Sequence, residues 1–95
     1  MNKDLFNDKF IKFFRALGNE ERIQILKLLK ENKELCAQEV EKNFYLEQST
    51  ISHHLNTLRR TGIVITRKSG RNIFYSLNLE SLKASWAEFE KYFNK

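Results

Sequence analysis

Hydrophobic positions in the first third of the chain recur with a helical period, and the segments they form are bounded by residues that typically end or start helices. Aromatic and leucine residues recur every three or four positions and predict a helix over 4–16 that ends at Gly18. Asn19 is expected to cap a second helix, which has an acidic first turn and runs to about Glu31.

Two more helices follow, separated by a tight turn. Cys36 stands where an N-cap is expected, ahead of a short helix over about 37–43. A turn at 45–47 then leads into a fourth helix over about 48–61, which Gly62 ends.

The hydrophobic period then changes from helical to β. β-Branched residues predict a strand over 63–66, a polar tip with a glycine covers 67–71, and a returning strand covers 72–77. Asn78 is expected to cap a last helix at roughly 80–93. The pattern therefore predicts a mainly α chain that carries one small β-hairpin.

The predicted order, α-α-α-α-β-β-α, fits one domain over residues 1–95. Two short helices joined by a tight turn and followed by a hairpin are typical of a winged helix-turn-helix. A chain of this length often gains stability by forming oligomers.

The fourth helix has a polar face that suits a DNA major groove. At 100° per residue, Ser52, His53, Asn56 and Arg60 fall within about 60° of Ser49, and the apolar residues fall on the opposite side. Small hydroxyl and amide side chains allow close approach to base edges. The predicted DNA-binding residues of this segment are Gln48, Ser49, Thr50, Ser52, His53, Asn56 and Arg60.

The distribution of charge supports a polyanionic partner. The formal net charge is +5, and residues 48–79 contain five Lys or Arg and no acid, whereas each flanking region is neutral. Three of these cations, Arg67, Lys68 and Arg71, surround the hairpin tip and are predicted to contact phosphates. The alternative is a solvated surface helix with an ordinary basic turn, but such a helix usually mixes Glu with Lys.

Four segments resemble the ArsR/SmtB family of winged-helix repressors. They read ALGNEERIQILKLL, ELCAQEV, QSTISHHLNTLRRTGIV and RKSGRNIFYSLN, and together they run from about Ala16 to Asn78. The resemblance implies a homodimer assembled through the first and last helices, which binds an operator through the fourth helix. It assigns DNA contacts to positions that match Gln48, Ser49 and the pair 52–53.

Dimerisation would also give a purpose to the aromatic residues near both ends of the chain. A lone monomer of this size should not need so much apolar surface, although some of these side chains are expected in the core. The predicted dimer-interface residues are Phe6, Phe10, Phe13, Trp86, Phe89 and Phe93.

The metal ligands implied by the resemblance are missing from the matching positions. Cys36 matches the first cysteine of one family site, but Gln38 replaces the second, and an amide is a poor ligand for soft metals. The second family site, on the last helix, corresponds here to Leu79, Ser81, Tyr92 and Lys95. We therefore expect no metal, no cofactor and no response to metals as inducers, and the inducer stays unknown.

Three single residues carry further expectations. Cys36 is a thiol sensor, part of an intersubunit site or a small structural cysteine, and its acidic sequence neighbours favour the structural role. His53 and His54 diverge by about 100° on a helix and cannot easily share an ion. His54 is therefore expected to be packed in the core or to lie on the dimer side. Tyr45 stands where the family usually has glycine, so the turn is expected to be built differently, with Asn43 as a candidate.

Other classes of protein are less consistent with the sequence. It has no phosphate-binding glycine loop and no nucleophile–base arrangement, so an enzyme is not expected. A single cysteine, no secretion signal and no membrane-spanning run predict a cytoplasmic protein. A winged helix that docks an acidic protein partner stays open as an alternative, as does activation in place of repression.

Overall fold

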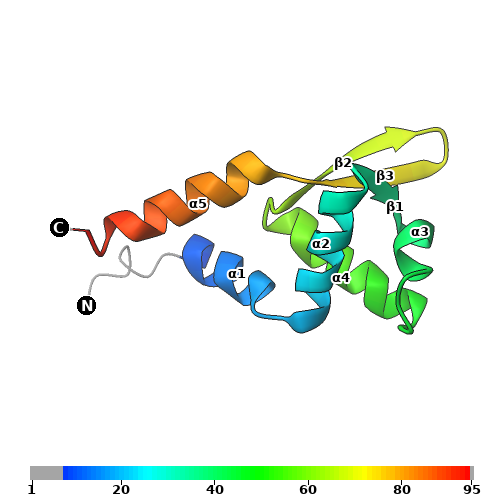
Figure 1. Cartoon of the computed structure of the whole chain (residues 1–95), viewed down its shortest axis with the longest axis horizontal. Helices are drawn as coiled ribbons and strands as arrows, with labels where there is room; N and C mark the ends of the chain where they lie inside the picture. Colours follow the sequence, from blue (N-terminus) through cyan, green and yellow to red (C-terminus); the bar gives the residue numbers. More distant parts are fainter. Residues whose placement is uncertain (1–7, 95) are drawn as a thin grey trace.

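The computed structural model describes residues 8–94, and it begins with two helices joined by a tight corner (Figure 1). α1 spans Asp8–Leu17 and α2 spans Glu20–Glu31. The Gly18 amide donates to a carbonyl in the last turn of α1 at 2.8 Å. The Asn19 side chain accepts a hydrogen bond from the Arg22 amide at 3.0 Å and caps α2. The predicted boundary between the two helices is confirmed, and the predicted start of the first helix lies outside the described residues.

The sheet has three antiparallel strands rather than two. β1, Glu34–Cys36, pairs with β3, Asn72–Leu77, which also pairs with β2, Val64–Ser69, so the strand order is β1-β3-β2. The prediction of an isolated hairpin was incomplete, and the observed order is α-α-β-α-α-β-β-α. β1 is only three residues long, which is too short to show a strand period, and its partner strand lies far along the chain.

The hairpin tip is shorter than predicted. The ladder between β2 and β3 continues to the pair Ser69–Asn72, so only Gly70 and Arg71 stand between the strands. Gly70 has a φ of 62°, a conformation that suits the first position of a two-residue hairpin turn. Arg67 and Lys68, predicted at the tip, therefore belong to a regular strand.

α3, Ala37–Glu41, and α4, Gln48–Arg60, form the helix-turn-helix pair. Cys36 is the N-cap residue of α3, as predicted. The turn between the two helices avoids strain at Tyr45, because Lys33 is the single non-glycine residue with positive φ among those described. Asn43 does not supply a left-handed turn either.

α4 ends in a Schellman motif at Gly62. The Ile63 amide donates to the Leu58 carbonyl at 3.0 Å, and the Gly62 amide donates to the Arg59 carbonyl at 3.1 Å. Gly62 has a φ of 76°, and both Ile63 and Leu58 are fully buried. The predicted stop at Gly62 is confirmed, and the motif sets the direction in which the chain enters β2.

α5, Leu79–Lys91, leaves the sheet and runs alongside α1, away from the helix-turn-helix body (Figure 1). Its N-cap Asn78 accepts a hydrogen bond from the Ser81 amide at 3.2 Å and donates to the Gly62 carbonyl at 3.2 Å. No residue of α5 is fully buried within the chain. The molecule is elongated as a result, with extents of 45 × 23 × 21 Å.

The hydrophobic core lies between α2, α4 and the sheet. It is formed by aliphatic side chains that are almost completely shielded from solvent, and α1 contributes its inner face. The largest fully buried side chains are Ile25, Leu29, Val40, Ile51, Leu55, Leu58, Ile63 and Val64. α4 is thus fixed to the core by one side and leaves the other side to solvent.

Candidate nucleic-acid interface

One face of α4 is exposed along the whole helix, whereas the opposite face is buried. Ile51, Leu55 and Leu58 are 0% exposed, and Thr50 is half-buried. Arg59 is exposed as well, and the other six exposed side chains form what we call the reading face: Gln48, Ser49, Ser52, His53, Asn56 and Arg60. The helical phase predicted from the sequence is confirmed, so these six side chains can meet a partner together.

The reading face is polar, partly cationic and free of acidic side chains. Asn56 Oδ1 accepts a hydrogen bond from Arg59 Nη2 at 3.0 Å, which orients the amide and leaves its N–H donors on the surface. No side chain caps the N-terminus of α4, since the Glu47 carboxylate makes no such bond. The face therefore presents hydroxyl, amide and imidazole groups of the types that bond to base edges.

The predicted cations of the wing, which consists of β2, β3 and their turn, do not lie on one side of the sheet. Arg67 pairs with Glu34 of β1 at 2.6 Å, and its guanidinium lies 5.0 Å from the centre of the Phe74 ring. Lys68 is the next residue of β2 and points to the opposite face. Arg71 occupies the exposed turn. Lys68 and Arg71 are thus better placed than Arg67 to meet phosphates.

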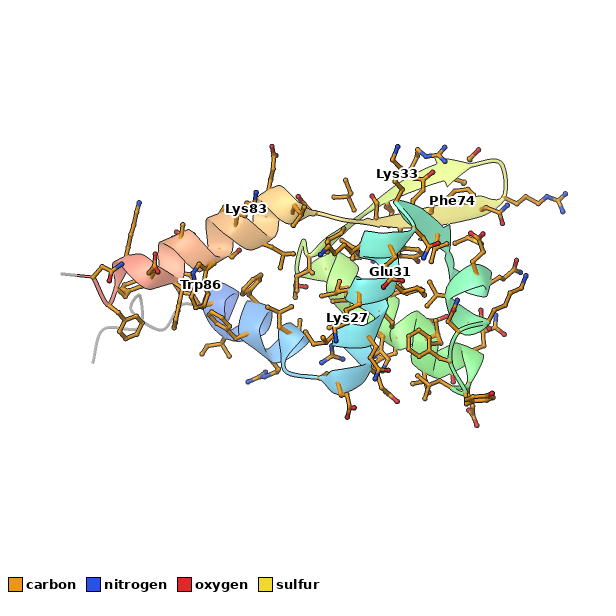
Figure 2. All side chains as sticks on the ribbon, viewed as in Figure 1. Lys27, Glu31, Lys33, Phe74, Lys83 and Trp86 are labelled. Atoms are coloured by element: carbon orange, nitrogen blue, oxygen red, sulfur yellow. The ribbon has the colours of Figure 1, made fainter. Side chains whose placement is uncertain are left out.

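The Glu34–Arg67 pair ties the first strand to the second across β3. The Arg67 guanidinium lowers the pKa of the Glu34 carboxyl from its usual 4.5, chiefly through their hydrogen bond. Phe74 of β3, labelled on the sheet in Figure 2, lies beneath the guanidinium. The sequence does not reveal this contact, because Glu34 and Arg67 lie 33 positions apart along the chain.

A buried histidine attaches α4 to the corner between α1 and α2. His54 is 5% exposed, and its Nε2 lies 2.7 Å from Glu21 Oε1 while its Nδ1 lies 3.1 Å from Arg22 Nη1. Arginine can only donate, so Nδ1 accepts and the ring proton stands on Nε2. The contact with Glu21 is therefore a hydrogen bond from a neutral imidazole. The expectation that His54 is packed is confirmed, whereas its partners were not foreseen.

Cys36 lies in a setting that does not favour a reactive thiol. It is half-buried, and the Glu39 carboxylate accepts a hydrogen bond from its amide at 2.9 Å. That bond, with a second one from the Cys36 thiol, lowers the pKa of the Glu39 carboxyl. Reactive cysteines usually lie exposed beside cations. Arg71 lines the same shallow groove as Cys36, but no contact between the two side chains is found.

No three His, Cys, Asp or Glu residues converge on a possible metal position within the described part of the chain. At the positions that match the family sites, Gln38, Leu79 and Ser81 are present as the sequence states, and Lys95 lies outside the described residues. None of these side chains is a usual soft-metal ligand.

Two of the aromatic residues predicted for a dimer interface are buried inside the chain instead. Phe10 is 8% exposed and Phe13 is 5% exposed. The Phe89 ring lies 6.1 Å from Phe10 and 4.6 Å from Phe14, centre to centre, and these contacts hold α5 against α1. The alternative assignment to the intramolecular core therefore describes Phe10 and Phe13.

α5 and the neighbouring helix α1 keep several large apolar side chains exposed. Trp86 is 54% exposed and Phe93 is 72% exposed, and Ile11 of α1 is 42% exposed. Figure 2 labels Trp86 on α5, in the part of the molecule that extends from the helix-turn-helix body. Phe6 lies outside the described residues. A surface of this kind on a small protein usually meets another protein.

No helix in the described residues combines the length and the apolar character needed to cross a bilayer.

Comparison with known proteins gives matches in both sequence and structure. The model of the family described as bacterial regulatory protein, arsR family, matches residues 19–66. The chain is 42% identical to the transcriptional activator HlyU of Vibrio cholerae over 76 residues, covering 80% of this chain and 69% of HlyU. It is 33% identical to the transcriptional repressor SdpR of Bacillus subtilis, covering 86% and 90% of the two chains.

A solved structure with the same fold comes from Mycobacterium bovis. It is the homodimeric winged helix-turn-helix DNA-binding domain of a possible ArsR-family transcriptional regulator. The TM-score is 0.72 at 25% sequence identity, and the match covers 84% of this chain and 74% of that one. The helix-turn-helix and the wing described above thus recur in a protein described as DNA-binding.

Proposed function

The chain belongs to the arsR family of bacterial regulatory proteins, and we propose that it binds its operator through the reading face of α4. It is a transcriptional regulator with a DNA-binding winged helix-turn-helix fold. The observation that carries this proposal is the exposure of six polar, non-acidic side chains on a helix whose other side is fully buried. Such a helix can enter the major groove without desolvating a carboxylate or leaving the core.

We propose that the protein acts as a homodimer, with operator half-sites related by the symmetry of the dimer. Trp86 and Phe93 give α5 an exposed apolar surface. This surface supports the proposal that a second copy of the chain packs against α5. Two copies would present two α4 helices to successive major grooves, which favours a pseudo-palindromic site with half-sites about one helical turn apart or a multiple of it.

We propose that the protein acts as a repressor. We also propose that residues 1–95 work as one domain and that the protein is cytoplasmic. The resemblance to winged-helix repressors supports repression. Of the two relatives described above, HlyU is named an activator and SdpR a repressor, so an expression assay of the regulated gene decides between activation and repression.

We further propose that metals are not the inducer. The positions that match the family's metal sites carry Gln38, Leu79, Ser81 and Tyr92 rather than usual ligands. Cys36, with a carboxylate beside its thiol, is proposed as a structural N-cap residue rather than a thiol sensor.

Selection of bound sequences from random duplex DNA tests these proposals together. A symmetric consensus should emerge, and zinc, cadmium or a thiol oxidant should leave its affinity unchanged. A consensus without symmetry would contradict the dimeric mode, and weaker binding with a metal would contradict independence from metals. If no sequence is enriched while an acidic protein partner is bound, the protein-docking alternative is the correct one.

A further inference from the structure

A groove beside the reading face is lined by cationic side chains of α1 and α2. It has a volume of about 470 Å³ and lies between the α1–α2 corner and the C-terminal half of α4. Lys12, Arg15 and Arg22 form one wall, and His53, Thr57 and Arg60 form the other. None of its lining residues is acidic. An exposed concavity with this composition favours an anionic occupant.

The groove continues toward the end of α4. Lys12 and Arg60 also line a neighbouring hollow of about 310 Å³ that extends to Gly62. Lys12 and Arg15 are exposed, and neither is ion-paired with another described side chain. A cationic strip therefore runs from α1 along the C-terminal half of the recognition helix.

The structure also holds this strip in position. Arg22 donates from Nε to the Ala16 carbonyl at 2.7 Å and from Nη2 to the Arg15 carbonyl at 3.3 Å. The same guanidinium contacts buried His54 of α4 at 3.1 Å. Arg22 thus fixes the last turn of α1 against α4, so Lys12 and Arg15 are the cations of this wall that stay available to a ligand.

The position of the groove around α4 identifies what it would meet. At 100° per residue, His53 lies at about 40° and Thr57 at about 80° from Ser49, so the groove flanks the reading face on the α1 side. When the reading face enters a major groove, this flank turns toward the sugar–phosphate backbone that borders it. The occupant that fits both the charge and the position is a run of DNA phosphates.

We propose that Lys12 and Arg15 of α1, together with Arg60 of α4, bind DNA backbone phosphates at the edge of the major groove that α4 reads. The proposal rests on the proposed function, since it requires α4 to lie in that groove. It adds a third contact region, from α1, to the recognition helix and the wing.

The test measures DNA affinity against salt concentration for the wild-type protein, for Lys12→Gln/Arg15→Gln and for Lys27→Gln/Lys30→Gln as the matched control. The control removes the same charge from exposed positions of α2 outside the groove (Lys27 is labelled in Figure 2). Each phosphate contact contributes about 0.9 to the slope of log K against log salt. The groove variant should lower the slope by about 2 for each bound protomer and weaken specific and random duplex equally, whereas the control should change neither.

Equal slopes for the groove variant and wild type would overturn the proposal, and so would an equal reduction in the control, which would indicate a general charge effect. A wild-type protein with no salt-dependent DNA binding would instead contradict the proposed function itself. Inorganic phosphate, titrated at constant ionic strength, distinguishes the two sources of phosphate. Saturable binding of free phosphate that Lys12→Gln/Arg15→Gln abolishes, with an unchanged DNA slope, would assign the groove to a small anion and overturn the backbone assignment.

Discussion

Gly62 is a residue at which backbone conformation decides how α4 connects to the wing. Its φ of 76° completes the Schellman motif, and an added Cβ would meet Ser81 Oγ at an ordinary 3.5 Å. The requirement for glycine is therefore conformational rather than steric. We expect Gly62→Ala to lower the free energy of unfolding by about 1–2 kcal/mol, because a left-handed conformation is unfavourable for L-residues. Chemical denaturation measures this decrease.

Gly62→Asn is the matched variant, since asparagine tolerates the left-handed region better than alanine does. It should be more stable than Gly62→Ala despite its larger side chain. Equal destabilisation of the two variants would show that crowding near Ser81, and not the backbone conformation, sets the cost.

Local residue patterns were predicted well, and contacts between distant residues were not. The caps at Asn19 and Asn78 and the exposed phase of α4 follow from interactions within a few positions, so spacing and residue type reveal them. The contact of His54 with Glu21 joins residues 33 positions apart, and only the folded chain shows it. The polar pattern indicated that His54 is packed, but it contained no information on what His54 packs against.

At the scale of elements, the wing is a pair of strands stabilised from β1 rather than a free basic loop. Arg67 is engaged by Glu34 and Phe74, whereas Lys68 faces the other side of the sheet and Arg71 occupies the turn. β1 escaped prediction because a strand of three residues is too short to show a period. Arg67 was assigned to the tip because it begins a polar run, 67–71, that contains a glycine.

The wing's cations are expected to contribute unequally to DNA binding. Lys68→Gln/Arg71→Gln should lower the slope of log K against log salt by about one for each phosphate that the variant no longer binds. Arg67→Gln should leave the slope nearly unchanged, because that side chain is already paired within the protein. Gel shifts over a range of salt concentrations provide the measurement. A larger effect of Arg67→Gln would mean that Arg67 leaves Glu34 when DNA binds.

The pair between β1 and β2 should also affect the dependence of stability on pH. The pKa of Glu34 is lowered in the folded protein, so its contribution exists above the usual value of 4.5 and is lost as the pH falls through the folded value. Glu34→Gln should therefore flatten the decline of unfolding free energy below pH 4.5.

Denaturant titrations at several pH values measure this decline, with Glu31→Gln as the control. Glu31 is an exposed carboxylate on α2, labelled in Figure 2. A profile for Glu34→Gln that matches both the wild type and the control would show that the pair with Arg67 does not contribute to stability.

At the scale of the whole molecule, α1 and α5 form an arm that extends from the helix-turn-helix body, and no residue of α5 is buried. Contacts between partly buried aromatic rings hold the two helices together, while Trp86 and Phe93 stay largely exposed. The sequence predicted an aromatic dimer interface, but it did not distinguish the rings that are buried between α1 and α5 from the rings that stay exposed. That separation depends on how α5 is rotated against α1, which helical spacing alone does not determine.

Trp86→Ala/Phe93→Ala should convert a dimer to a monomer without unfolding it, because neither side chain belongs to the core. Sedimentation equilibrium measures the mass, and circular dichroism checks the fold. Tyr45→Ala is the control, since Tyr45 is also an exposed aromatic residue but lies on the helix-turn-helix, where its removal should not affect association. A dimer that persists in the double variant would require a different interface.

The central claim is that the reading face of α4 recognises DNA sequence, and the ratio of specific to non-specific affinity tests it most directly. The ratio would be measured for the wild type, for Ser52→Ala/His53→Ala and for Gln24→Ala/Lys27→Ala as an exposed control on α2. Affinity for the selected site should fall about tenfold or more for each base that the variant no longer bonds, while affinity for random duplex stays near the wild-type value. Equal decreases on both duplexes, or a ratio as high as that of the control, would contradict the assignment of this face.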